Sequence, residues 1–423
     1  MCIRDRMKTN DATSAIPGKG AMSGVKVLDW TSYQFGPVAS SMMGDMGADV
    51  VKIESLDGDI GRAVARMSSR PIGLEGGRNA YFETCNRNKR GIAVDLKTEQ
   101  GMRIVHELVK SADVFVENYR KGVPEKLGVD YETLKKINPK LIYASGSGYG
   151  PDGPDASKPS LDGCGQARSG LMMSATFDGQ NEPSYVAGAV SDQMGGIILC
   201  LGIVSALFAR EQTGKGQRVD VSHLSSSMWL QGLSVGMELL SNYQFGSMDR
   251  KNPLNPLVNA YECGDGRWIQ FMSAQFERYW ADFATALDIT QYIDHPFVGE
   301  IKGMTAGSPE LTRIIAERFK TKSSDEWVSI FNEYEDLIFA KVQYVSELKN
   351  DPQVIANNYI SEFEHPTLGT TKMCSFPVTF SDTPASIWKE APELGQDTES
   401  ILIEELNYNW EDITELQNTG SIL

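Results

Sequence analysis

Short apolar runs alternate with amphipathic, helical stretches over the first half of the chain. Six such runs are separated by stretches long enough for a helix: Val25–Trp30, Asp49–Glu54, Gly91–Leu96, Asp113–Asn118, Lys140–Ser145 and Arg218–Ser222. A strand that returns parallel to its neighbour needs a long crossover, and a helix supplies it. We therefore predict an α/β fold with a doubly wound parallel sheet.

The pattern changes after a polar stretch rich in Pro and Asn at residues 244–256. Tyr261–Met272 predicts a hairpin that turns at Gly264–Gly266, and amphipathic helices follow, as in a smaller α+β domain. We expect five segments along the chain: a disordered or non-native N-terminus at 1–22, a large domain at 23–222, a helical linker at 223–256, a small domain at 257–344 and a C-terminal return to the large domain at 345–423.

The chain is acidic, with 40 Lys and Arg against 56 Asp and Glu and a formal net charge of -16. Such a charge disfavours nucleic acid and anionic membranes as main partners. The longest apolar run, Met194–Ala209, is shorter than the ~20 residues of a membrane span, and we interpret it as a buried helix. The six cysteines have no CxxC or zinc-site spacing, which predicts free thiols, no metal site and a reducing, cytoplasmic location.

Residues 86–126 depart from the acidic average, with nine basic side chains against six acidic ones. A basic region on an acidic protein favours a small ligand that carries several phosphates, although a solvated face is an equal alternative. The chain has neither a P-loop nor a GxSxG motif. Gly146–Gly153 runs into prolines instead of opening a helix, so we interpret it as a turn and not as a dinucleotide fingerprint.

Asp192 is the candidate nucleophile that position suggests. It lies at the start of the most apolar helix, where free backbone N–H groups favour a carboxylate. Helix capping is the alternative role, but Ser191 can cap equally well. Gly195 and Gly196 are expected to leave room for a ligand. We interpret the four histidines as surface or helix residues and not as catalysts: His106, His223, His295 and His365.

Three segments resemble the family III CoA-transferases, the CaiB/BaiF type: residues 24–54, 86–101 and 112–154. The similarity continues through AGAVSDQMGG, which contains Asp192, and weakens toward the C-terminus. The resemblance implies a Rossmann-like large domain that binds coenzyme A, a small domain inserted late and an interlocked homodimer. It also implies transfer of CoA from an acyl-CoA donor to a small carboxylic acid acceptor, with no tightly bound cofactor.

The resemblance assigns site residues one by one. The family's catalytic aspartate falls on Asp192, which would form a mixed anhydride and then an aspartyl-CoA thioester. Backbone amides near Gly195 or in Gly146–Gly150 are the expected oxyanion donors. The family's CoA contacts fall on Gln34, Phe35, Val94, Asp95, Leu96, Lys97, Asn118, Tyr119, Lys126, Ser160, Leu161 and Asp162.

Departures from the family pattern bear on the substrate and on the alternatives. Ser55 stands where an arginine often meets the nucleotide. Asn255–Tyr261 replaces the glycine-rich flap of formyl-CoA transferases, which favours larger organic acids, including aryl and hydroxy acids, over formate or oxalate. An α-methylacyl-CoA racemase is one alternative, but its histidine is replaced here by Leu161. A non-catalytic CoA-binding protein is the other, and the intact aspartate argues against it.

Overall fold

The computed structural model describes residues 19–67, 69–176, 182–244, 249–299, 301 and 308–423. The described residues form two compact units. The larger unit holds residues 19–171, 185–236 and 353–423. The smaller unit holds the described residues within the two ranges 172–184 and 237–352. The larger unit therefore includes the C-terminal segment. The expectation of disorder for residues 1–18 lies outside the described residues, and Met22 is buried in a hydrophobic core.

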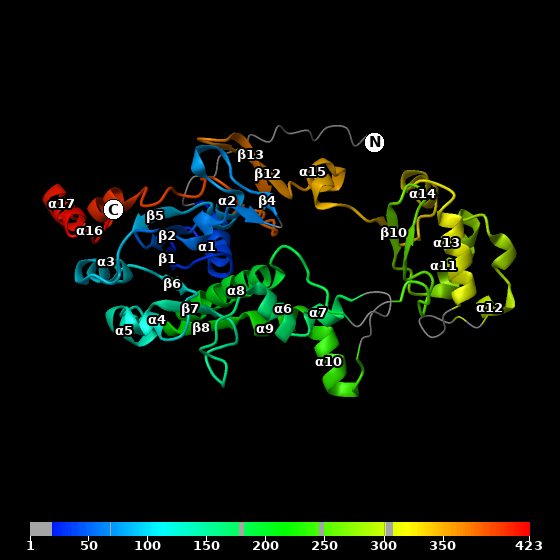
Figure 1. Cartoon of the computed structure of the whole chain (residues 1–423), viewed down its shortest axis with the longest axis horizontal. Helices are drawn as coiled ribbons and strands as arrows, with labels where there is room; N and C mark the ends of the chain where they lie inside the picture. The colour runs from blue at the N-terminus through cyan, green and yellow to red at the C-terminus, as the bar shows by residue number, and fades with distance from the viewer. Residues whose placement is uncertain (1–18, 68, 177–181, 245–248, 300, 302–307) are drawn as a thin grey trace. The chain divides into compact units, whose positions relative to one another are not determined.

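A six-stranded parallel sheet forms the centre of the larger unit (Figure 1). Its order is β5-β2-β1-β6-β7-β8, so the chain winds outward from β1 in one direction and then restarts beside it at β6. The predicted doubly wound parallel sheet is confirmed. In such a sheet, ligands bind where the winding reverses, at the carboxyl ends of the strands. The strands are β1 Lys26–Trp30, β2 Asp49–Glu54, β5 Arg90–Ala93, β6 Val114–Glu117, β7 Ile142–Ser147 and β8 Arg218–Ser222.

Helices cover both faces of this sheet because successive strand residues point to opposite sides. On one face, Val27 and Val114 pack against helices α1 (Phe35–Asp45) and α8 (Val190–Thr213). On the other face, Leu28 and Phe115 belong to a separate core with four helices. Those four helices are α3 Glu99–Val109, α5 Tyr131–Ile137, α16 Thr398–Leu406 and α17 Trp410–Asn418.

Helix α8 is only partly buried. Leu199 and Ile203 are buried, whereas Leu201 and Phe208 are exposed. The interpretation of this segment as a buried helix is therefore wrong for its outer face. Within the described residues α8 is the one helix whose length and composition would allow it to cross a membrane, yet its inner face packs on α1 and the sheet.

Shorter elements complete the larger unit. A hairpin of β12 (Ile360–His365) and β13 (Gly369–Cys374) lies in its C-terminal segment, and β3 (Arg66–Met67) pairs with β4 (Arg70–Pro71). Three further helices, α7 Leu171–Ser174, α10 Gly232–Ser241 and α15 Pro352–Ala356, each span a boundary between the two units. The remaining helices and 3₁₀ turns of the larger unit are α2 Ala80–Asn86, α4 Val123–Lys126, α6 Asp162–Arg168, α9 His223–Leu230, η1 Ile60–Ala63 and η2 Glu75–Gly77.

The smaller unit is built on a three-stranded antiparallel sheet, β11-β10-β9. The predicted hairpin is present, and Gly266 adopts φ 76° at its turn, a conformation that glycine favours. Aromatic rings in edge-to-face contact around Phe271 and Phe319 fill the core. The elements are β9 Ala260–Glu262, β10 Trp268–Phe271, β11 Phe339–Lys341, α11 Phe276–Ala286, α12 Pro296–Gly299, α13 Pro309–Phe319, α14 Ser324–Phe331, η3 Thr290–Tyr292 and η4 Val345–Asn350.

Candidate active site

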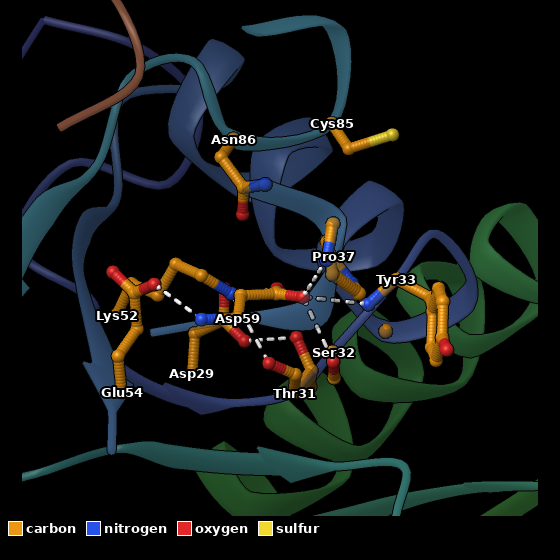
Figure 2. A network of polar contacts seen from close by, with 12 residues as sticks. Asp29, Thr31, Ser32, Tyr33, Pro37, Lys52, Glu54, Asp59, Cys85 and Asn86 are labelled. Atoms are coloured by element: carbon orange, nitrogen blue, oxygen red, sulfur yellow. Dashed lines mark hydrogen bonds and ion pairs between the residues drawn. The ribbon is translucent and has the colours of Figure 1, made fainter. Parts of the chain in front are cut away.

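Two buried ion pairs lie beside the loop that follows β1, at the switch point of the sheet. Figure 2 shows the network of polar contacts around Asp29, Lys52 and Asp59. Asp29 Oδ2 lies 2.8 Å from Lys89 Nζ, and Asp59 Oδ2 lies 2.8 Å from Lys52 Nζ. The side chains of all four residues are at most 1% exposed. Burial alone would raise the pKa of Asp29, but the ammonium groups of Lys89 and Lys52 outweigh it and hold that pKa well below its ordinary value.

These ion pairs fix the backbone of residues 31–34. Lys52 Nζ donates to the carbonyl oxygen of Thr31 at 3.1 Å. Asp59 Oδ1 accepts from Ser32 Oγ at 2.8 Å and from Tyr33 N at 3.1 Å. Tyr33 has φ 64°, a left-handed conformation that costs free energy in a non-glycine residue and needs such support. The loop is therefore held in one conformation before any substrate arrives.

Asn118 and Tyr119, two of the predicted CoA contacts, support the same loop. Asn118 Oδ1 accepts from Ser32 N and Asn118 Nδ2 donates to Ser32 O, both at 2.8 Å. Tyr119 stacks on Trp30 with ring centroids 4.1 Å apart. Both residues follow β6, which lies beside β1, so the two strand ends hold each other at the switch point.

The fixed loop leads into α1 and brings two predicted residues, Gln34 and Phe35, against α8. Gln34 Nε2 donates to Gln193 Oε1 at 3.2 Å. A Cβ at Gly195 would lie 2.7 Å from the Phe35 ring, and one at Gly196 would lie 2.8 Å from the carbonyl oxygen of Phe35. The expectation that these glycines leave room for a ligand is wrong, since α1 occupies that space.

Asp162 holds the first turn of α8. Its Oδ1 accepts from Ser191 N at 2.7 Å and from Asp192 N at 3.2 Å. Its Oδ2 accepts from Gln166 Nε2 at 2.8 Å and from Tyr185 OH at 2.7 Å. Capping by Ser191 or Asp192 is therefore a wrong interpretation: both residues lie inside a helix that begins at Val190, and a carboxylate from α6 satisfies their N–H groups.

Asp192 pairs with a histidine. His223 Nε2 lies 2.7 Å from Asp192 Oδ1, and the two side chains are 7% and 14% exposed. On the other side of the imidazole, Nδ1 lies 3.3 Å from Ser160 Oγ, and the Phe35 ring lies 4.9 Å away, centroid to centroid. The interpretation of His223 as a surface or helix residue is confirmed for the helix, since His223 begins α9, but the residue is buried and not on the surface.

Close packing of α6 and α9 places this histidine. A Cβ at Gly165 would lie 2.6 Å from the Cβ of His223, so only glycine allows this approach. No pattern in the sequence around His223 signals the contact, because its partners come from other elements. The interpretation of His365 as a surface or helix residue is wrong, because His365 ends strand β12 and is not exposed. It is buried, with Nε2 3.5 Å from Glu83 Oε2.

Tyr81 of α2 is a further residue whose ionisation the Asp192 carboxylate influences, which the sequence did not indicate. Burial, then the Cys85 thiol and the Asp192 carboxylate, hold the pKa of Tyr81 far above its ordinary value. A phenol of this kind stays protonated and can donate a hydrogen bond. Among the described residues no group of three or more His, Cys, Asp or Glu is placed to hold a metal ion.

The other predicted CoA contacts lie elsewhere around the sheet. Val94 and Leu96 are buried after β5, where Val94 bridges to Ile422. Asp95 Oδ1 accepts from Lys97 N at 2.9 Å. Lys97, Lys126 and Leu161 are exposed. The structure thus brings together Gln34, Phe35, Ser160, Asp162 and Asp192, while Val94–Lys97 lie after β5 and Lys126 ends helix α4.

Part of the basic region at residues 86–126 serves the interior. Arg87 pairs with Asp45 at 2.6 Å, Lys89 with Asp29 at 2.8 Å and Arg90 with Asp49 at 2.7 Å. These three cations stabilise the fold and are not offered to a ligand. The exposed cations of the region include Lys97, Arg103, Lys110, Arg120, Lys121 and Lys126.

Comparison with known proteins gives one consistent result. A family model described as CoA-transferase family III matches residues 22–398. The (R)-2-hydroxy-4-methylpentanoate CoA-transferase of Clostridioides difficile is 31% identical over 94% of this chain and 98% of its own. The cinnamoyl-CoA:phenyllactate CoA-transferase of Clostridium sporogenes is 31% identical over 95% of this chain and 97% of its own. The crystal structure of a CAIB/BAIF family protein from Brucella suis superimposes with a TM-score of 0.79 at 28% identity, covering 92% of this chain and 100% of that one.

Proposed function

Because the chain belongs to CoA-transferase family III, we propose that it moves coenzyme A from an acyl-CoA donor to a carboxylic acid through covalent attachment to Asp192. It is an enzyme of the transferase class, and CoA thioesters are the substrates of such enzymes. One observation carries the covalent step: the Asp192 carboxylate is fixed at one oxygen by His223, and within the described residues no hydrogen bond occupies its other oxygen. A carboxylate with one unbonded oxygen can act as a nucleophile.

In the first half-reaction, Asp192 attacks the donor thioester carbon. The C–S bond breaks, the CoA thiolate leaves, and a mixed anhydride joins the donor acyl group to Asp192. The thiolate then attacks Cγ of Asp192, the bond from Cγ to the bridging oxygen breaks, and the donor acid departs. The enzyme now holds CoA as an aspartyl thioester.

The second half-reaction reverses these steps with another acid. The acceptor carboxylate attacks Cγ and expels the thiolate, which gives a new mixed anhydride. The thiolate attacks the acceptor acyl carbon, the acyl-CoA product leaves and Asp192 regains its carboxylate. Thioester energy is conserved throughout, and the enzyme's part is to position the groups and stabilise each oxyanion.

We propose acids larger than formate or oxalate as substrates. Asn255–Tyr261 lacks the glycine-rich flap of formyl-CoA transferases, and Leu257 and Tyr261 of this segment are buried in the core of the smaller unit. The two relatives above are named for a branched hydroxy acid and for aryl acids. A panel of hydroxy, aryl and dicarboxylic acids, tested as acceptors with one donor thioester, would rank these classes.

An α-methylacyl-CoA racemase is less well supported. Racemisation needs two bases on opposite sides of the α-carbon. Here His223 bonds directly to Asp192 at 2.7 Å, which leaves no space between them for a substrate carbon. Leu161, at the position of the racemase histidine, is exposed and has no titratable group.

We propose that a second copy of the chain covers the apolar faces of α8 and α9. These helices pack on each other and expose Leu201, Phe208 and Trp229, large apolar side chains whose contact with water is unfavourable. A homodimer in solution is expected, and Phe208→Glu with Trp229→Glu should give monomers in light scattering.

The cytoplasmic location also stays a prediction. The described cysteines, Cys85, Cys164, Cys200, Cys263 and Cys374, are free thiols.

The test of the function is a transfer assay with Asp192→Asn. We expect wild-type protein to convert an acyl-CoA and a second acid into the new acyl-CoA, and Asp192→Asn to lose this activity because a neutral amide is a poor nucleophile. Asp152→Asn is the matched control, because Asp152 is exposed on the loop that follows β7. Unchanged turnover in Asp192→Asn would support a non-covalent or merely CoA-binding role.

A further inference from the structure

We propose that His223 is a catalytic residue whose Nε2–H stabilises the oxyanion that forms on Asp192 Oδ1, and that Oδ2 is therefore the attacking oxygen. The proposal rests on covalent catalysis by Asp192. It replaces the backbone amides expected from the sequence as oxyanion donors for the steps at Cγ.

The hydrogen-bond geometry assigns the imidazole proton. An ionised carboxylate can only accept hydrogen bonds, so the 2.7 Å contact requires a proton on His223 Nε2. In the neutral ring Nδ1 is then an acceptor, and Ser160 Oγ lies 3.3 Å from it as the available donor. The ring thus presents one N–H to Asp192 without needing a positive charge.

The two oxygens of Asp192 are consequently different. Oδ1 is bonded to His223, while Oδ2 accepts no hydrogen bond from any described residue. An oxygen that keeps a hydrogen bond is a weaker nucleophile than one that is free. We therefore assign attack on the donor thioester to Oδ2, which becomes the bridging oxygen of the anhydride and leaves with the donor acid.

Charge develops on Oδ1 twice in each turnover. It does so when the thiolate attacks Cγ of the anhydride, and again when the acceptor carboxylate attacks Cγ of the thioester. In both steps the Cγ–Oδ1 double bond opens and Oδ1 becomes the oxyanion, directly against the Nε2–H of His223. In the acylation and final deacylation steps the oxyanion is on the substrate instead, so His223 contributes to two of the four steps.

The surroundings hold the ring ready for this role. The Phe35 ring packs against it at a tilt of 44°, Ser160 bonds its far nitrogen and Gly165 lets α6 approach its Cβ. A donor that is already oriented stabilises an oxyanion without reorganising during the reaction. Removal of one such donor typically slows a reaction by about 10²–10³-fold.

The test separates the steps in a single turnover. Wild-type protein and His223→Leu are mixed with a donor acyl-CoA without acceptor, quenched in acid at increasing times and weighed intact by mass spectrometry. We expect wild-type protein to carry CoA on Asp192. His223→Leu should acylate at a rate near wild type but accumulate the acyl anhydride, with CoA adduct forming about 10²–10³-fold more slowly.

Two further variants control this comparison. His223→Gln should largely restore the rate of CoA adduct formation, because its amide nitrogen takes the place of Nε2 and can donate. His295→Leu, the same change at an exposed histidine of the smaller unit, should match wild type. If His223→Leu does not fold, His223→Asn replaces it, since its amide is too short to reach Oδ1.

Two outcomes overturn the proposal. One is formation of the CoA adduct in His223→Leu or His223→Asn at the wild-type rate. The other is equal slowing of acylation and CoA adduct formation, which would mean that His223 only supports the local structure. Failure of the proposed function is distinguishable, since wild-type protein itself would then carry neither the acyl group nor CoA on Asp192.

Discussion

Asp162 Oδ1 accepts a hydrogen bond from the backbone N of Asp192 at 3.2 Å, so one carboxylate fixes the backbone of the other. Asp162 is buried and its second oxygen is also engaged, by Gln166 and Tyr185. Four donors therefore converge on a side chain that the sequence suggested as a contact for CoA. Its position explains how the first turn of α8 can be held without a side-chain cap of its own.

We expect Asp162→Ala to lower the free energy of unfolding by about 2 kcal/mol, because helix N–H groups and two buried side-chain donors lose their acceptor. The kcat for transfer should fall even under conditions where the variant is fully folded, because Asp192 moves with the first turn of α8. Urea unfolding and kcat measure the two effects. Asp152→Ala, at an exposed position, should leave both unchanged.

Gly165→Ala should displace His223 and lower kcat, because the new Cβ would lie 2.6 Å from the Cβ of His223. Gly163→Ala lies on the same helix and has its nearest contact at 3.7 Å, to Tyr185, an ordinary van der Waals distance. It should therefore behave like wild type. Equal kcat values for the two variants would contradict the inference that the close packing of Gly165 on His223 positions the histidine.

Much of the fold could be predicted from the sequence because the signals are local. Apolar alternation predicts β2 at Asp49–Glu54 and β8 at Arg218–Ser222 with the bounds that the structure has. The start of α8 near Asp192 was predicted for the same reason. The positions of strands and of helix N-termini depend on residues that are neighbours in the sequence, so the sequence alone can show them.

The contacts of the site are not local, and the sequence did not indicate them. Asp162 lies 29 residues before Ser191, and His223 lies 31 residues after Asp192, with no periodic pattern linking them. Gly195 suggested space for a ligand because sequence alone cannot show that Phe35 fills it. Likewise, the sequence places Lys89 in a basic region suited to a ligand or to solvent, and only the fold shows it buried beside Asp29.

Lys89→Met should lower the free energy of unfolding by about 3–5 kcal/mol, because it leaves the Asp29 carboxylate buried without its main partner. The loop at residues 31–34 should lose order with it, and activity should fall as well. Lys26→Met breaks a partly exposed pair with Glu405 and should cost at most about 1 kcal/mol. Chemical denaturation compares them, and similar losses would contradict the importance of the buried pair.

Glu117→Gln should make stability less dependent on pH. Burial raises the pKa of Glu117 to about 7 from 4.5, although Ser145 and the backbone N of Tyr119 hydrogen-bond to it. A raised folded-state pKa contributes stability that is present below the unfolded pKa and is lost as the pH rises through about 7. The amide variant does not titrate. Its free energy of unfolding, relative to that of wild type, should therefore rise by about 3 kcal/mol as the pH goes from 4.5 to above 7.

Denaturant unfolding of both proteins between these pH values measures the difference. Glu132→Gln, at an exposed position on α5, serves as the control and should follow wild type. A difference between Glu117→Gln and wild type that stays constant, or that shrinks as the pH rises, would contradict this assignment.

Covalent catalysis by Asp192 is tested most directly by trapping with hydroxylamine. Protein treated with an acyl-CoA and hydroxylamine is digested, and the peptide that carries the new hydroxamate is identified by mass spectrometry. We predict modification at Asp192 alone, dependent on the thioester and absent from Asp192→Asn. A hydroxamate at another residue, or none while CoA transfer proceeds, would contradict the mechanism.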